Sequence, residues 1–339
     1  KLEVAQEAGA DTVMDLSIAG DLVAIRKDML SRTPLPLGTV PLYSVAQRYI
    51  DKDRDPADID PEELFAEVEM QAEQGVDFMT LHCGLTRRGA EWAARGERAL
   101  GIVSRGGSIL ARWMLKNDKE NPLLTGYDRL LELARKYNVT LSLGDGLRPG
   151  AGCDAGDAAQ WEEVMTLGAL AKRGLEYGVQ CMIEGPGHVP MNEVEAQIIS
   201  IKKMTHVLGP LTIDSSPGYD HIAGAIGGAM AVRVGVDFLC YLTPAEHLTL
   251  PDMDDVRQGI MASRVAAQAG EVALGRPHAL AREAKMAKAR MALDWPAMRE
   301  AAIDPAILDK RREPHKHEEA CAMCGNFCAV KMLRDAKQM

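Results

Sequence analysis

The chain has 339 residues, 47% of them hydrophobic and 26% charged, which is the usage of ordinary globular proteins. A formal net charge of -10 at pH 7 argues against a general surface for nucleic acid. No apolar run reaches the roughly 18 residues of a membrane span and nothing at the start resembles a secretion signal, so we expect a cytoplasmic protein with neither nucleic acid nor membrane as a partner.

The first residues, KLEVAQEAGA, have a helical pattern, so we expect the chain to begin within a longer natural sequence. Short apolar, β-branched runs follow, and each predicts a strand. In chain order they are TVMDLS (12–17), LGTVPLY (37–43), FMTLHCG (78–84), GIVSRGG (101–107), VTLSLGDG (139–146), VQCMIEG (179–185), GPLTID (209–214) and DFLCYLTP (237–244). Amphipathic segments such as YDRLLELARKYN (127–138) separate most of them. Eight strands alternating with helices favour an α/β fold, a closed (β/α)8 TIM-type barrel over residues 1–250.

Beyond residue 250 the strand pattern stops. Ala- and Met-rich stretches predict a helical segment over residues 251–305. The charged, Pro-containing stretch DPAILDKRREPHKHEEA (304–320) predicts a linker or extended arm. It leads into a Cys-rich end, so we expect residues 306–339 to form a linker and a metal-binding arm.

Polar or ionisable residues follow almost every predicted strand. In a barrel these carboxyl ends converge on one face, where barrel active sites lie. Any one of them could be a helix cap or a solvated loop residue, but together they favour an active site. They are Asp15, Ser17, Tyr43, His82, Ser104, Arg105, Asp145, Arg148, Glu184, His188, Asp214 and His247.

Three cysteines near the end, Cys321, Cys324 and Cys328, have the spacing C-x2-C-x3-C. A structural zinc site would need a fourth ligand, which His315 or His317 could supply. A [4Fe-4S] cluster bound by three thiolates would instead leave one iron open to substrate or cofactor. The three thiols alone leave both interpretations open.

Two further groups of residues point to ligands. His188 and His247, at the ends of two strands, suit a divalent metal, although they could equally be unrelated loop histidines. SRGGS (104–108) and GDGLRPG (144–150) place glycines beside Arg105 and Arg148, which suits an anion such as phosphate. Asp145 and Glu184 could transfer protons or hold an amino-substituted ring.

Long motifs in this order resemble the phosphomethylpyrimidine synthase superfamily of radical S-adenosylmethionine (SAM) enzymes. They are TVMDLS, GTVPLY, GIVSRGGS, LSLGDGLRPG, MIEGPGHVP, LGPLTIDSSPGYDHIAGAIGGAM, LCYLTPAEHLTLP and the closing Cys segment, and the resemblance runs from about residue 5 to 333. It implies a (β/α)8 barrel followed by a helical segment and a C-terminal iron-sulfur arm. It also implies a homodimer with exchanged cluster arms, and an electron donor such as flavodoxin or ferredoxin.

The same resemblance implies the ligands. Cys321, Cys324 and Cys328 would hold a [4Fe-4S] cluster whose fourth iron chelates SAM, and His188 and His247 would bind zinc or iron. The implied substrate is 5-aminoimidazole ribotide. Its implied contacts are Met14, Tyr43, His82, Ser104, Arg105, Gly106, Asp145, Gly146, Leu147, Arg148 and Glu184.

The superfamily has two branches, and the sequence departs from the thiamin branch at positions expected to face the substrate. Ile18, Cys83, His206 and the pair Ser215–Ser216 are the departures. We therefore expect the branch that makes 5-hydroxybenzimidazole for cobamide lower ligands, with His206, Asp145 and Glu184 as catalytic residues. The alternative is a phosphomethylpyrimidine synthase that makes hydroxymethylpyrimidine phosphate for thiamin.

A function of a different class also fits the residues. A zinc-dependent barrel hydrolase or aldolase would use His188, His247 and a carboxylate, with the three cysteines as a separate structural zinc site. Such a protein would be colourless and insensitive to air, whereas an iron-sulfur protein would be coloured and sensitive to air.

Overall fold

The computed structural model of the chain describes residues 1–202 and 210–336. The chain forms two compact units, Lys1–Ala266 and Ala267–Met339. The division into a barrel, a helical segment and a cluster arm at residues 250 and 305 stays a prediction. Among the described residues, no helix is both long and apolar enough to cross a membrane.

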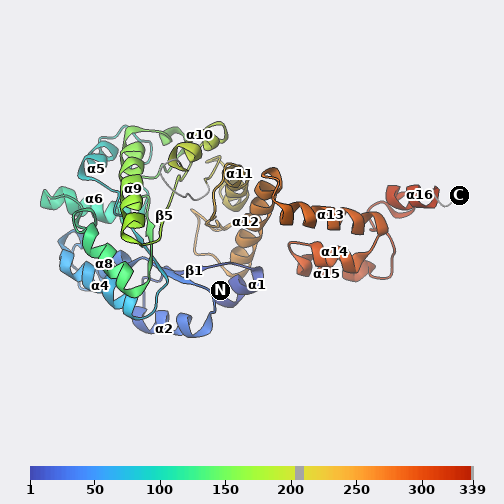
Figure 1. Ribbon diagram of the computed structural model, residues 1–339, viewed down its shortest axis with the longest axis horizontal. Helices are drawn as coiled ribbons and strands as arrows, with labels where there is room; N and C mark the ends of the chain where they lie inside the picture. The colour runs from blue at the N-terminus through green and yellow to red at the C-terminus, as the bar shows by residue number, and fades with distance from the viewer. Residues whose placement is uncertain (203–209, 337–339) are drawn as a thin grey trace. The chain divides into compact units, whose positions relative to one another are not determined.

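The first unit has a mixed α/β fold built on a parallel sheet, as the sequence predicts, and it is consistent with a TIM-type fold (Figure 1). Five hydrogen-bonded strands follow one another in chain order across the sheet. They are β1 (Val13–Asp15), β2 (Leu37–Thr39), β3 (Phe78–Leu81), β4 (Thr140–Leu143) and β5 (Cys181–Ile183). After β5, an isolated parallel bridge pairs His188 with Leu211.

Helices connect the strands, as expected for parallel neighbours. Around the sheet α3 packs on α4, α4 on α8, and α8 on α9, which also packs on β5. The helices that begin in this unit are α1 (Leu2–Ala8), α2 (Leu22–Arg32), α3 (Pro41–Ile50), η1 (Pro56–Asp58), α4 (Pro61–Glu73), α5 (Arg87–Ala94), α6 (Arg105–Asn117), α7 (Pro122–Thr125), α8 (Tyr127–Tyr137), η2 (Gly152–Asp154), α9 (Ala158–Tyr177), α10 (Met191–Lys202), α11 (Asp220–Arg233) and α12 (Met253–Ala273).

Three predicted strands are not regular strands. The prediction for 101–107 is wrong, because Ser104 caps a helix there: its Oγ accepts the Gly107 N–H at 3.1 Å, and α6 begins at Arg105. Within the described part of 209–214, Leu211 makes only the bridge to His188. The stretch 237–244 carries no assigned strand.

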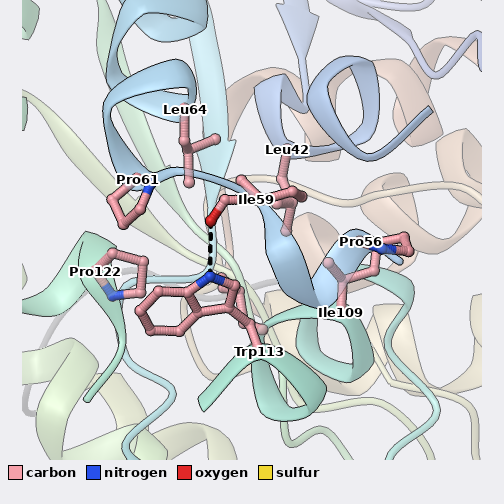
Figure 2. Close-up of a pocket in the computed structure, with 9 residues that line it drawn as sticks. Leu42, Pro56, Ile59, Pro61, Leu64, Ile109, Trp113 and Pro122 are labelled. Atoms are coloured by element: carbon pink, nitrogen blue, oxygen red, sulfur yellow. Dashed lines mark hydrogen bonds between the residues drawn. The ribbon is translucent and has the colours of Figure 1, made fainter. Parts of the chain in front are cut away.

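Helix α6 is anchored far from its first turn in an apolar pocket beside α3 and α4. Figure 2 shows the Trp113 indole in this pocket, where its Nε1–H donates to the Ile59 carbonyl at 2.8 Å. The indole is 7% exposed, and Leu42 and Leu64 line the same pocket. Since the ring is packed and its only donor is satisfied, the helix has one well-defined position against the core.

The second unit is helical. It contains the end of α12, then α13 (Pro277–Ala292), α14 (Trp295–Ala301), α15 (Pro305–Arg312), η3 (Glu313–His315), η4 (Gly325–Phe327) and α16 (Ala329–Ala336). The stretch predicted as a linker contains α15, because Asp304 caps it by accepting the Ile307 N–H at 3.1 Å. Trp295 donates to the Glu319 carbonyl at 2.9 Å, which ties the start of the Cys segment to α14.

Candidate active site

The carboxyl ends of β3, β4 and β5 bring His82, Asp145 and Glu184 to one edge of the sheet. Leu143 of β4 is in register with Leu81 of β3 and with Ile183 of β5. The residues that follow these strands are therefore neighbours, as the barrel prediction requires.

Glu184 is fixed by two hydroxyl groups from the neighbouring strands. Thr80 donates to its Oε1 at 2.8 Å and Ser142 donates to the same oxygen at 3.0 Å. Thr80 and Ser142 are register partners on β3 and β4. The other carboxylate oxygen accepts from neither hydroxyl.

Asp145 is buried and paired with Arg148. The Arg148 Nη1 donates to Asp145 Oδ1 at 3.1 Å. Burial raises the pKa of Asp145 to about 6, with the Glu184 charge adding to the rise and Arg148 opposing it. In turn, the Asp145 charge raises the pKa of Arg148, which stays a cation.

Tyr43 and Arg105 lie over the same group of charges. The Arg105 guanidinium stacks on the Tyr43 ring at 4.9 Å from the centroid. Burial raises the pKa of Tyr43, and the charges of Arg105, Arg148, Glu184 and Asp145 all act on it. The site thus combines two guanidinium groups, two carboxylates and a phenol.

His82 is enclosed by the first turn of α6. Its Nε2 lies 3.2 Å from Ser104 Oγ, and a side chain on Gly106 would have its Cβ 2.2 Å from His82 Cε1. Burial lowers the pKa of His82 to about 3, so the ring is neutral at physiological pH. Its Nδ1 has no hydrogen-bond partner in the described part of the structure.

Gly146 and Leu147, expected to contact substrate, have their amides already bonded. Both donate to the buried carboxylate of Glu163, at 2.8 and 2.6 Å. The Leu147 side chain is completely buried. By contrast, Arg105 and Gly106 occupy the first turn of α6, where backbone N–H groups have no partner within the helix.

His188 and His247 do lie together. Their ring centroids are 5.3 Å apart. Asp214 Oδ1 lies 2.6 Å from the Nδ1 of His188, and Asp220 Oδ1 lies 3.1 Å from the Nδ1 of His247. Such carboxylate partners leave Nε2 of each ring for another ligand. Among residues 1–202 and 210–336, no third His, Cys, Asp or Glu completes a metal-binding group with them.

The two halves of the site are linked through the backbone. The His188 N–H donates to the Pro149 carbonyl at 3.0 Å, directly after Arg148. Asp214 Oδ2 accepts the Gly152 N–H at 2.7 Å. Burial raises the pKa of Asp214, but the Gly152 amide and His188 outweigh this effect and lower it below its usual value. The pair of histidines and the loop that carries Asp145 therefore belong to one site.

Residues 1–335 match the family model described as the Radical SAM ThiC family. The chain is a member of that family.

Curated relatives agree with this membership. The chain is 50% identical over 340 residues to a phosphomethylpyrimidine synthase of Moorella thermoacetica, covering 98% of the chain and 79% of the relative. It is 49% identical to the enzymes of that name from Thermodesulfovibrio yellowstonii and Methanopyrus kandleri, with coverage of 99% of the chain and 81% and 80% of the relatives. The chain is thus an enzyme of a radical SAM family, whose members use SAM and a [4Fe-4S] cluster.

In the described structure of this ThiC-family chain, Cys321, Cys324 and Cys328 are not bonded to one another. All are free thiols; Cys321 and Cys324 are exposed and Cys328 is buried. No group of three metal-binding side chains is formed among the described residues. An all-thiol donor set with two accessible members suits a [4Fe-4S] cluster. Of the two histidines that could complete a zinc site, His315 is already paired with Glu318 at 2.8 Å.

Other expected site residues are less informative. Met14 lies in the middle of β1, in register with Gly38. His206, expected to be catalytic, lies outside the described residues. Cys83 does not face the site: it is 0% exposed within the main hydrophobic core. This departure from the thiamin branch is thus a change in core packing.

Sequence reasoning did not single out Thr80, Ser142, Glu163 or Cys240. The first two could have been found, since each is a hydroxyl residue flanked on both sides by apolar residues of its strand. Cys240 is accessible to solvent, yet the surrounding protein desolvates its thiol and, with Glu184 and Glu246 nearby, raises its pKa to about 11. It lies within residues 237–244, where no strand is assigned, so only the proximity of Glu184 reveals it.

Proposed function

We propose that this chain is a phosphomethylpyrimidine synthase, which rearranges 5-aminoimidazole ribotide to hydroxymethylpyrimidine phosphate for thiamin. The observation that carries the proposal is identity of about half the residues, along essentially the whole chain, to enzymes of that name. The site supports it with a set of charges suited to a small phosphorylated amine.

The side chains divide this substrate between them. Arg105 and Arg148, with the open first-turn amides of α6, suit the phosphate. The second Glu184 oxygen suits the exocyclic amine, and Asp145, whose pKa of about 6 lies near neutrality, can hold or release a proton. Tyr43 covers the group from above Arg105 and helps to exclude water.

Two metal groups complete the proposal. Cys321, Cys324 and Cys328 would bind the [4Fe-4S] cluster, which when bound supplies the electron that cleaves SAM. His188 and His247 would hold zinc or iron, with Asp214 and Asp220 orienting the rings. We further propose a homodimer with exchanged cluster arms, reduced by a donor such as flavodoxin or ferredoxin in the cytoplasm.

A second candidate product is 5-hydroxybenzimidazole. It is favoured by two departures from the thiamin branch, the exposed Ile18 and the Ser215–Ser216 pair. The Oγ of Ser216 is buried without a partner among the described residues. Cys83 no longer supports it, since it packs in the core. We rank it below the thiamin product because the relatives that share about half of the residues are named for the thiamin enzyme.

One incubation distinguishes these products. The protein is reconstituted anaerobically with iron and sulfide, given the ribotide, SAM and a reductant, and its product is identified by mass. We expect hydroxymethylpyrimidine phosphate. Detection of 5-hydroxybenzimidazole would assign the chain to the other branch, and a protein that stays colourless near 410 nm, the region where [4Fe-4S] proteins absorb, would support the zinc hydrolase or aldolase instead.

A further inference from the structure

We propose that Glu163 is a positioning residue: it fixes the loop that presents Asp145 and Arg148, and so sets the affinity for substrate. Only the identity of the substrate in this inference rests on the proposed function.

Both oxygens of the Glu163 carboxylate are used on consecutive backbone amides. Oε1 accepts the Gly146 N–H at 2.8 Å, and Oε2 accepts the Leu147 N–H at 2.6 Å. Glu163 belongs to α9 and is 2% exposed. Burial raises the pKa of Glu163 to about 8, and its bonds from the Leu147 and Gly146 amides oppose that rise. A buried carboxyl group that accepts from two adjacent amides fixes both the position and the orientation of the peptide between them.

The opposite side of the loop is closed by α6. A Cβ on Gly107 would lie 2.2 Å from the Gly146 carbonyl oxygen, so the two backbones are in close contact there. A Cβ on Gly146 would lie 3.1 Å from both Glu163 Oε1 and the Gly107 Cα. Gly146 is therefore packed closely against both α9 and α6.

The Leu147 carbonyl is also tied to α9. Arg98 Nη2 donates to this oxygen at 2.8 Å, and its Nε and Nη2 donate to the two Asp157 oxygens at 2.6 and 2.7 Å. Asp157 is the N-cap of α9, where it accepts the Gln160 N–H at 2.8 Å. The N–H of Leu147 is thus held by α9 through Glu163, and its carbonyl is held by the same helix through Arg98 and Asp157.

These contacts lie one residue from Asp145 and one from Arg148, yet Glu163 itself bonds only backbone. Rotation of the Gly146–Leu147 peptide would move both functional side chains, and small misplacements of positioning groups reduce binding strongly. Without Glu163, two buried N–H groups would lose their acceptor, which favours such a rotation.

Glu163→Gln is the main test, because it keeps the volume but places an N–H₂ group against one of the two amide donors. In the reconstituted holoenzyme we expect the KM for 5-aminoimidazole ribotide to rise about tenfold or more, with the KM for SAM unchanged. Hydrogen exchange of the peptide covering 144–150 should accelerate. Glu176→Gln, at an exposed position on the same helix, is the matched control and should change neither.

Each outcome decides the proposal. Equal loss of kcat with both KM values unchanged, or unaltered hydrogen exchange of 144–150, would overturn it, because Glu163 would then affect only the amount of folded enzyme. If Glu163→Gln does not fold, Glu163→Asp takes its place; if neither folds, Glu163 is structural and the proposal is wrong. Faster exchange in a protein that does not convert the ribotide would confirm the loop contact and refute the proposed substrate.

Discussion

His82 illustrates how burial sets the chemistry of a single residue. Ser104 Oγ accepts the Gly107 amide, so its own hydrogen can be donated to His82 Nε2, 3.2 Å away. This arrangement leaves the proton of the neutral ring on Nδ1, which has no partner among the described residues. The ring would therefore offer a ligand a hydrogen-bond donor rather than a positive charge.

The low pKa of His82 predicts a pH dependence of stability. The ring is neutral in the folded protein down to a pKa of about 3, but titrates near 6.5 when unfolded. Below pH 6.5 the unfolded chain binds the extra proton, so folding stability is lost as pH falls, by about 1.4 kcal/mol per pH unit for this group.

Urea unfolding of wild type and His82→Gln at pH 6.5 and pH 5 measures this contribution. We expect the variant to be less stable at both values but to lose less stability on acidification. His278→Gln, at an exposed histidine, should follow wild type. Parallel pH profiles for His82→Gln and wild type would show that His82 is protonated in the folded protein.

At the scale of elements, α6 connects the site to the core. Its first turn contacts His82, and Trp113 lies in the apolar pocket near α3 and α4 (Figure 2). Because the helix is anchored at Trp113, its N-terminal amides and Arg105 keep a defined position over the site. The glycines at 106 and 107 allow this contact, since any side chain there would collide with His82 or with Gly146.

Ser104→Ala should therefore have two effects. Loss of the N-cap destabilises the protein by about 1 kcal/mol, and loss of the His82 contact weakens binding of the ribotide. Thr86→Ala is the matched control, since Thr86 caps α5 through the Gly89 N–H at 3.0 Å but does not contact His82. Urea unfolding and isothermal titration of both variants separate the effects. Equal affinity in the two would show that the hydroxyl at 104 is only a cap.

The sequence predicts some of these elements better than others. The five strands of the sheet are apolar runs followed by polar residues, and both features are local. The run GIV before Ser104 has the same apolar character, but Ser104 caps a helix through the Gly107 N–H, and the two glycines that follow pack against His82 and Gly146, which are distant in the sequence, so the strand prediction failed. The proximity of His188 and His247 could be predicted, because both were expected at the carboxyl ends of strands. Glu163 and Cys240, by contrast, reach the site through tertiary contacts that no local sequence pattern records.

The two proposed metal groups lie in different units of the chain. His188 and His247 lie in Lys1–Ala266, and Cys321, Cys324 and Cys328 in Ala267–Met339. The main hydrophobic core is built from residues 42–236 and includes none of the cysteines of the closing segment. Loading of the two proposed metal groups should thus be independent.

Metal analysis of two variants checks this independence, and each variant is the control of the other. Cys324→Ala should lose the cluster irons and SAM cleavage while keeping one divalent metal. His247→Ala should lose that metal while keeping the cluster, because its ring nitrogen is the ligand removed. Neither should change the unfolding of the barrel unit. Full iron content in Cys324→Ala, or unchanged divalent metal in His247→Ala, would contradict the assigned ligands.

The close approach of Gly107 to the Gly146 carbonyl also limits how this site can change during evolution. Gly107 cannot acquire a side chain alone, because the backbones of two elements would have to separate first, and a Cβ on Gly146 would lie only 3.1 Å from the Gly107 Cα. New specificities must then arise by exchanging side chains around this loop, such as Tyr43, over an unchanged backbone. Paralogues with different products would accordingly share this loop and differ in the side chains around it.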